Sequence, residues 1–253
     1  MTDLTARMRA VRERVVSAAT DAGRDPREVR ILVAVKTQPT EEILAALDAG
    51  ATVLGHNRVD ELAGSGPALS APDVLGHEMH LIGHLQSNKI NAALPWTTCV
   101  QSIESTRRAR KIDEAVGRRL DAGEGIGPRR QPRPLDVMIQ VNTSREPTKH
   151  GVDPESAVDL AAYVGERPHL RLTGLMTIGA NSPDAGLVRA SYTELAELRE
   201  RIGQEVGGLG ALELSMGMSG DIEPAVAAGA TIVRVGTAVF GPRPAPARPD
   251  PHE

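Results

Sequence analysis

Short apolar runs alternate with amphipathic segments along most of this chain. The run VRILVAV at 29–35 is rich in β-branched residues and predicts a buried strand. Over residues 3–22, apolar side chains recur at steps of three and four, which predicts an amphipathic helix that ends at Gly23. Further strands are predicted at 52–54, 79–82, 98–101, 135–141, 171–176, 211–215 and 231–235. Further helices are predicted between Thr40 and Gly50 and at 57–63, 85–93, 104–121, 154–165, 184–206 and 220–228.

The alternation amounts to eight strands, counted from 29–35, with helices between them. Such alternation favours a parallel sheet, and eight repeats favour closure of that sheet into a barrel. We therefore predict an α/β fold: a single (β/α)8 TIM-like barrel over residues 1–241, with an extra N-terminal helix. The last twelve residues, 242–253, contain five prolines and are expected to form a disordered tail.

Composition and charge narrow the functional classes. The 253 residues fit one α/β barrel, since such barrels often run to about 250 residues. Only 2% of the residues are aromatic while 40% are hydrophobic, so the core must be built from aliphatic side chains. The net charge of −4 gives no reason to expect nucleic acid or a membrane surface as a partner.

The cellular setting is predicted from cysteine use and from the apolar runs. The one cysteine, Cys99, cannot form an internal disulfide and is expected to be a small core residue. No apolar run approaches the length of a membrane span. We expect a cytoplasmic protein that is a monomer.

Lys36 is the first candidate for chemistry, because it directly follows the strand at 29–35. Active sites of such barrels lie at the carboxyl ends of the strands. A lysine partly withdrawn from water at that place gives up its proton more readily, and its amine can form an imine. The alternative is a lysine whose stem lies along the strand end while its amine reaches solvent.

A phosphate site is indicated at the last two strand ends. The strand at 211–215 runs into Ser215-Met216-Gly217-Met218-Ser219-Gly220 and a short helix, and Gly236-Thr237 follow the strand at 231–235. Barrels commonly bind phosphate with these two loops and a helix N-terminus. The alternative is that Ser219 merely caps its helix and the glycines make turns.

Arg234 is a charged residue within the apolar strand at 231–235. A buried guanidinium needs an acceptor, which favours a functional partner over surface decoration. Facing a pyridine nitrogen, an arginine would donate to it and discourage its protonation.

The histidines His77, His80 and His84 raise the alternative of a metal site. They straddle a predicted strand end, without an HExxH motif or carboxylates at a typical spacing. We expect no metal here, and a supporting position behind the site for His80.

Several longer segments carry a resemblance to a known family. They are AVKTQP around Lys36, GHNRVDE at 55–61, HLIGHLQSNK at 80–89, QVNTSREPTKHG at 140–151, LTGLM at 172–176, LSMGMSGDIEPAV at 214–226 and VRVGTAVFG at 233–241. Together they resemble the pyridoxal-phosphate homeostasis proteins, single-domain relatives of the alanine racemase barrel. The match is collinear and spans nearly the whole chain. The resemblance implies a barrel of the alanine racemase N-terminal type with pyridoxal 5′-phosphate as its cofactor.

The resemblance also implies roles for individual residues. It makes Lys36 the Schiff-base lysine, Ser219, Gly236 and Thr237 phosphate contacts, Arg234 the partner of the pyridine nitrogen, and Asn57 a neighbour of the cofactor. The chain departs from the family at a few places. Family members usually carry Glu-Asn-Tyr at 56–58, proline at His84 and tryptophan at Met79. These departures put the polarity of the rim and the pocket shape in doubt.

Three functions compete. The resemblance implies a protein of vitamin B6 homeostasis that stores pyridoxal phosphate or delivers it to apo-forms of dependent enzymes, without strong catalysis of its own. The alternatives are an amino-acid racemase that uses the same lysine and a Schiff-base aldolase without a cofactor. The aldolase leaves Arg234 without an obvious task.

A racemase needs a second acid on the ring face opposite the lysine. In the alanine racemases that acid is a tyrosine from a separate β-domain. Here Tyr163 and Tyr192 both fall in predicted helices, and fewer than twenty residues follow the strand at 231–235, so no such domain is expected. The candidate substitute is a histidine, His80 or His84. We therefore expect a carrier without catalytic residues.

Overall fold

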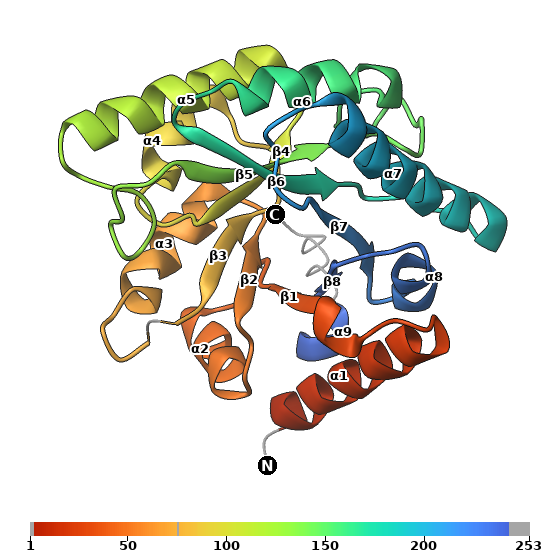
Figure 1. The fold of residues 1–253 in the computed structure, drawn as a ribbon. Coiled ribbons are helices and arrows are strands. Elements are labelled where there is room, and N and C mark those ends of the chain that lie inside the picture. The colour runs from red at the N-terminus through yellow and green to blue at the C-terminus, as the bar shows by residue number, and fades with distance from the viewer. Residues whose placement is uncertain (1–2, 75, 243–253) are drawn as a thin grey trace, which may run out of the picture.

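The computed structural model describes residues 3–74 and 76–242. In this part of the chain, eight parallel strands close into a barrel in sequence order, and β8 pairs with β1 (Figure 1). The strands are β1 Arg30–Ala34, β2 Val53–His56, β3 Glu78–Leu81, β4 Cys99–Ile103, β5 Leu135–Gln140, β6 Leu170–Met176, β7 Glu213–Met218 and β8 Ile232–Val235. The predicted (β/α)8 barrel is confirmed. The prediction of a disordered tail concerns residues that, except for Pro242, lie outside the described ranges.

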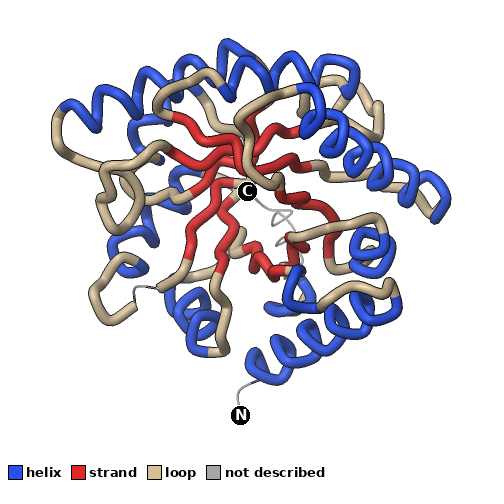
Figure 2. The backbone as a smooth tube through the Cα atoms, in the orientation of Figure 1, coloured by secondary structure: helices blue, strands red, loops and turns tan. Residues whose placement is uncertain are grey.

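Helices surround the strands (Figure 2). They are α1 Asp3–Asp21, α2 Thr40–Asp48, α3 Val59–Leu69, α4 Ile90–Ala93, α5 Thr106–Asp121, α6 Ala157–Gly165, α7 Ala185–Glu205, α8 Ile222–Ala227 and α9 Thr237–Phe240, with 3-10 turns at Pro26–Glu28, Ser87–Lys89 and Pro154–Ser156. The pattern analysis missed α9, because four residues are too few to show a helical period. None of the helices in the described ranges is long and apolar enough to cross a membrane.

The extra N-terminal helix α1 lies beside α8 and α9 (Figure 1). Its Arg14 forms an ion pair with Glu223 of α8 and donates from Nη1 to the backbone oxygen of Ser219 at 2.5 Å. The helix therefore supports the loop between β7 and α8 from outside the barrel.

Apolar side chains form two separate cores because successive residues of a strand point to opposite faces. The larger core fills the space between the barrel and its helices. The smaller one lies within the barrel and contains Leu32, Val53, Cys99, Met138, Met176 and Ile232. Cys99 is buried there, as the sequence predicted.

Strand β7 extends further than its pattern indicated. The sequence predicts a strand at 211–215, but β7 runs from Glu213 to Met218. The pairing of β7 with β8 is irregular between Ser215 and Met218, and Gly217 within it has a φ of 86°. A bulge at a glycine lets the strand continue through small residues that are typical of a loop. Ser215, the last residue of the predicted strand, lies inside the barrel and is fully buried.

The strand predicted at 52–54 stops short of His56, whereas the structure includes His56 in β2. It is the last residue of β2 and 1% exposed, on the side of the strand that carries the buried Leu54 of the outer core. Its Nε2 atom has no hydrogen-bond partner in the described chain. Burial, together with the nearby His77, lowers the pKa of His56 to about 4.

Acid should therefore destabilise the protein through His56. Since its folded-state pKa of about 4 lies below the usual 6.5, the neutral ring contributes stability above pH 6.5 that is lost as the pH falls toward 4. The loss amounts to roughly 3 kcal/mol at most. We expect urea unfolding to show this loss between about pH 7 and pH 4. His56→Leu should flatten the profile, whereas substitution of the largely exposed His150 by Gln should leave it unchanged. An unchanged profile in His56→Leu would contradict the assignment.

Candidate functional site

A pocket of about 380 Å³ opens at the carboxyl ends of the strands. All six candidates from the sequence line it: Lys36, Asn57, Ser219, Arg234, Gly236 and Thr237. They come from the ends of β1, β2, β7 and β8, which meet at one rim because the strands are parallel and the barrel is closed. The lining also contains residues that the sequence did not single out, namely Gln38, Ile82, Ile178, Gly220, Phe240 and Gly241.

Lys36 lies two residues beyond Ala34, so the alternation of β1 turns it toward the barrel axis. Its side chain is half-buried. Within the described residues its Nζ makes no hydrogen bond or ion pair. By contrast, the amine of Lys89 binds Asp60 at 2.8 Å and that of Lys149 binds Glu146 at 2.7 Å. Lys36 thus offers an uncommitted amine inside a pocket.

The backbone turns sharply just after Lys36. Thr37 has a φ of 62°, a conformation that β-branched residues rarely adopt, and its hydroxyl donates to the carbonyl of Lys36 at 2.6 Å. Such a conformation costs on the order of 1–3 kcal/mol and persists only where surrounding structure enforces it. Because of this turn, the chain follows the direction of β1 only as far as Lys36 and then leads away from the rim.

Free backbone donors gather on the neighbouring part of the rim, after β7 and β8. No described residue accepts a hydrogen bond from the N–H groups of Ser219, Gly220, Gly236 or Thr237. A Cβ atom at Gly236 would lie 3.2 Å from the carbonyl oxygen of Ala34, so this position favours glycine. These N–H groups can bind an anion, provided that it enters the pocket.

Ser219 does not cap helix α8, so that alternative from the sequence is wrong. The N-cap residue is Asp221, and no side chain makes a capping bond there. The carboxylate of Asp221 instead accepts from the backbone N–H of Met218 at 2.5 Å and from the hydroxyl of Tyr192 at 2.8 Å. Its negative charge is thus engaged by its own loop and by α7, and the loop keeps its shape.

Arg234 is 7% exposed, lines the pocket and reaches into the barrel. Its Nη1 donates to the carbonyl and the hydroxyl of Ser215, at 2.6 and 3.0 Å, and its Nη2 donates to the carbonyl of Thr177 at 2.7 Å. Burial lowers the pKa of Arg234 to about 10, so it stays charged at neutral pH. No described residue accepts from Nε, which leaves this N–H group free for a ligand.

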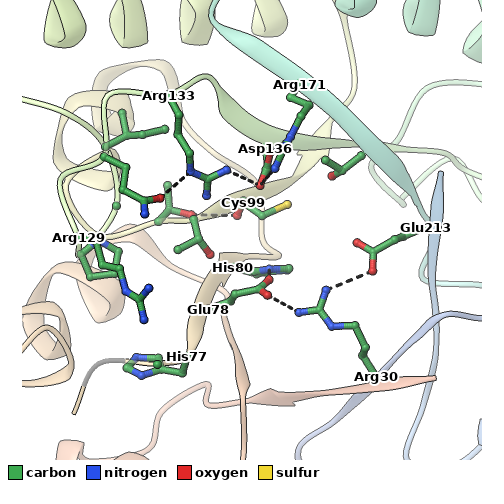
Figure 3. A pocket seen from close by; sticks show the side chains of 18 residues that line it. Arg30, His77, Glu78, His80, Cys99, Arg129, Arg133, Asp136, Arg171 and Glu213 are labelled. Atoms are coloured by element: carbon green, nitrogen blue, oxygen red, sulfur yellow. Dashed lines mark hydrogen bonds and ion pairs between the residues drawn. The ribbon is translucent and has the colours of Figure 1, made fainter. Parts of the chain in front are cut away.

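A larger hollow, of about 460 Å³, lies at the opposite, amino ends of the strands (Figure 3). Its acidic groups are neutralised by its arginines. Arg30 binds Glu78 at 2.5 Å and Glu213 at 3.2 Å, while Asp136 binds both Arg133 and Arg171 (Figure 3). Because these charges satisfy one another, the smaller pocket with its free donors and free amine is the better candidate site.

The histidines noted in the sequence do not gather in one place. His80 lies inside the barrel and binds Glu78 and Gln101, while His77 faces the carbonyl of Val74. His84 instead lies near Glu104 and His150, the one group of metal-ligand type found among the described residues.

Arg108 makes this second group unsuitable for a cation. Its guanidinium donates to Nε2 of His84 at 3.0 Å and lies 3.4 Å from the Glu104 carboxylate, which binds Nδ1 of His84 at 3.2 Å. A histidine that binds a metal through one nitrogen needs an acceptor opposite the other. Here a positively charged donor occupies that place.

Comparison with known proteins gives a consistent match. Residues 7–244 match the family model of the alanine racemase N-terminal domain. The pyridoxal phosphate homeostasis protein of Vibrio cholerae is 38% identical over 236 residues, which cover 90% of this chain and 92% of that protein. A crystal structure of an unknown protein from Bifidobacterium adolescentis is 35% identical, with a TM-score of 0.84, and covers 95% of this chain and 97% of that one. The structure of PipY from Synechococcus elongatus with pyridoxal phosphate bound is 29% identical, with a TM-score of 0.74, and covers 90% of this chain and 100% of that one.

Proposed function

Since the chain belongs to the alanine racemase N-terminal domain family, and within it to the pyridoxal phosphate homeostasis proteins, we propose that it binds pyridoxal 5′-phosphate in the pocket at the carboxyl ends of the strands. The observation that carries this proposal is the convergence of three unlike groups in one pocket. They are the free amine of Lys36, the free Nε–H of Arg234 and the free backbone N–H groups of the two loops after β7 and β8.

The three groups match the three reactive parts of the cofactor. An aldehyde calls for an amine, a pyridine nitrogen for a hydrogen-bond donor, and a phosphate for several N–H groups. Ser219 and Thr237 add hydroxyl groups beside the backbone donors, and Asn57 also lines the pocket. The apolar side chains of Ile178 and Met218, 38% and 39% exposed, provide surface for the ring.

Attachment uses the amine of Lys36. Its Nζ forms a C=N bond with the aldehyde carbon, and the aldehyde oxygen leaves as water. An incoming amine can add to the same carbon and take over the C=N bond, which returns Lys36 to a free amine. Attachment is therefore reversible without any oxidant or reductant, which suits storage and delivery to apo-forms of dependent enzymes.

The racemase alternative has little support in the described chain. Tyr163 lies in α6 and Tyr192 in α7. Tyr192 is fully buried and its hydroxyl binds Asp221, so it cannot reach a ligand in the pocket. His80 is held inside the barrel, and Nε2 of His84 faces Arg108.

The first test of the proposal concerns Lys36. The protein loaded with pyridoxal phosphate should absorb visible light, and borohydride reduction followed by peptide mass mapping should find the pyridoxyl group on Lys36. Lys36→Ala should abolish the visible band, because no other lysine is among the described residues that line the pocket. A reduced adduct found only on Lys89, Lys111 or Lys149 would refute this assignment.

The second test concerns the phosphate. Ser219→Ala and Thr237→Ala each remove one hydroxyl that can donate to a charged acceptor, so the Kd for pyridoxal phosphate should rise up to about tenfold to a hundredfold. The fold should persist, since both hydroxyl groups lack protein partners in the described structure. Titration of the single variants and of the double variant measures the effect. Wild-type affinity in all three would place the phosphate elsewhere.

The third test separates a carrier from a racemase. Incubation of the loaded protein with L-alanine in deuterated water should leave the α-proton signal unchanged in NMR, because none of the described residues places an acid opposite Lys36. Transfer of pyridoxal phosphate to an apo-enzyme should restore the activity of that enzyme. Proton exchange at a catalytic rate that disappears in Lys36→Ala would establish the racemase instead.

A further inference from the structure

A continuous chain of hydrogen bonds runs through the barrel from its amino end to Arg234. At the amino end, Glu78 of β3 accepts from Arg30 and binds Nε2 of His80 at 2.8 Å (Figure 3). Nδ1 of His80 lies 2.8 Å from Nε2 of Gln101 on β4. The hydroxyl of Ser215 on β7 donates to Oε1 of Gln101 at 2.7 Å and accepts from Nη1 of Arg234 at 3.0 Å.

Both ends of this chain impose the same direction on its hydrogen bonds. A guanidinium has donors only, and an ionised carboxylate has acceptors only. Although burial by itself raises the pKa of Glu78, hydrogen bonds from His80 and Arg30 outweigh it and lower that pKa to about 2.

While the His80 ring carries a single proton, the groups between the two ends have one arrangement each. Arg234 donates to Ser215, Ser215 to Gln101, Gln101 to Nδ1 of His80, and His80 from Nε2 to Glu78. Gln101 and Ser215 are fully buried and His80 is 2% exposed, so water does not offer these groups alternative partners.

We propose that Gln101 and Ser215, oriented through His80 by Glu78, are positioning residues that hold Arg234 with its Nη1 in the barrel and its Nε toward the cofactor pocket. The hydroxyl of Ser215 donates a hydrogen bond to Gln101. This donation makes the hydroxyl oxygen of Ser215 a better acceptor for Arg234. Without this chain of hydrogen bonds, the guanidinium keeps the carbonyls of Ser215 and Thr177 as partners. It loses the bond from Nη1 to the hydroxyl of Ser215, which fixes Nη1 from the barrel interior. The inference rests on the proposed function, because it concerns the contact of Arg234 with the pyridine nitrogen.

The orientation can be tested without any cofactor. In the apo-protein, ¹⁵N NMR of labelled histidine should show His80 with its proton on Nε2, and the Nε–H signal of Arg234 should be sharp and single. Gln101→Met keeps the length of the side chain but removes both of its hydrogen bonds. It should leave the proton of His80 on Nε2, where Glu78 still accepts it, but broaden or shift the Arg234 signal. An unchanged Arg234 signal in a folded Gln101→Met protein would overturn the proposal.

With cofactor, the sharpest reporter is pyridoxal phosphate labelled with ¹⁵N at its ring nitrogen. In Ser215→Ala and Gln101→Met, the ring signal should move away from its wild-type position. The Kd should rise about threefold to tenfold, the factor that one ordinary hydrogen bond supplies. Ser215→Thr retains the hydroxyl and should restore the wild-type signal.

The chain offers a matched control at its amino end. Glu78 and Glu213 are each the first residue of a strand, both bind Arg30 and both line the same hollow, but only Glu78 contacts His80. Glu78→Gln introduces a donor that no longer dictates which nitrogen of His80 carries the proton. Although Glu78 lies at the other end of the barrel, Glu78→Gln should shift the ¹⁵N signal of the pyridine ring. Glu213→Gln should leave that signal unchanged.

The outcomes separate the two proposals. If wild-type protein takes up no pyridoxal phosphate, the proposed function fails, and the apo-protein spectra still decide whether the chain orients Arg234. If wild-type protein binds it but Ser215→Ala, Gln101→Met and Glu78→Gln give wild-type ring signals, the positioning role is refuted. Equal shifts in Glu78→Gln and Glu213→Gln would also refute it, since they would reflect a general loss of charge in the hollow.

Discussion

The guanidinium of Arg234 lies buried inside the barrel, and much of the interior is arranged around it. Removing a full charge from water is costly unless hydrogen bonds replace the lost hydration. The carbonyls of Ser215 and Thr177 and the hydroxyl of Ser215 supply these bonds. An apolar residue at this position would avoid the cost altogether, and buried charges are often less stabilising than well-packed apolar groups. The position of Arg234 is therefore better explained by a ligand than by stability.

The two ends of the barrel differ in whether their charged and polar groups are paired. At the amino ends of the strands, Arg30, Glu78, Glu213 and Asp136 take part in ion pairs with groups of opposite charge. At the carboxyl ends, the amine of Lys36 and several backbone N–H groups have no partner among the residues that the structure describes. Paired charges hold strand ends together, while unpaired donors can bind a ligand. This agrees with the general division in such barrels between a stabilising face and a functional face.

The rim of the pocket is shaped from outside as well as from within. Tyr192 of α7 and Arg14 of α1 both bind the segment between β7 and α8, through Asp221 and the carbonyl of Ser219. The extra helix α1 thus supports the site although none of its residues lines the pocket. Loops held in this way keep their N–H groups aimed at one place, so little ordering is needed when an anion binds.

The sequence by itself determined the order of elements and the positions of the main candidates. Periodicity is local, so eight alternations of strand and helix could be counted, and Lys36 and Arg234 stood out as charged residues within or just after apolar strands. Tertiary structure alone decided where polar groups meet. The bulge at Gly217 extended β7 to Met218, and the alternation of side chains along β2 buried His56 on the outer face of the barrel. The bond between Gln101 and Ser215 joins residues 114 positions apart. Gln101, a polar residue in an apolar strand, was the one local signal of that bond. Its partner could not be read from the sequence, because such contacts depend on the closure and register of the barrel, which no local pattern encodes.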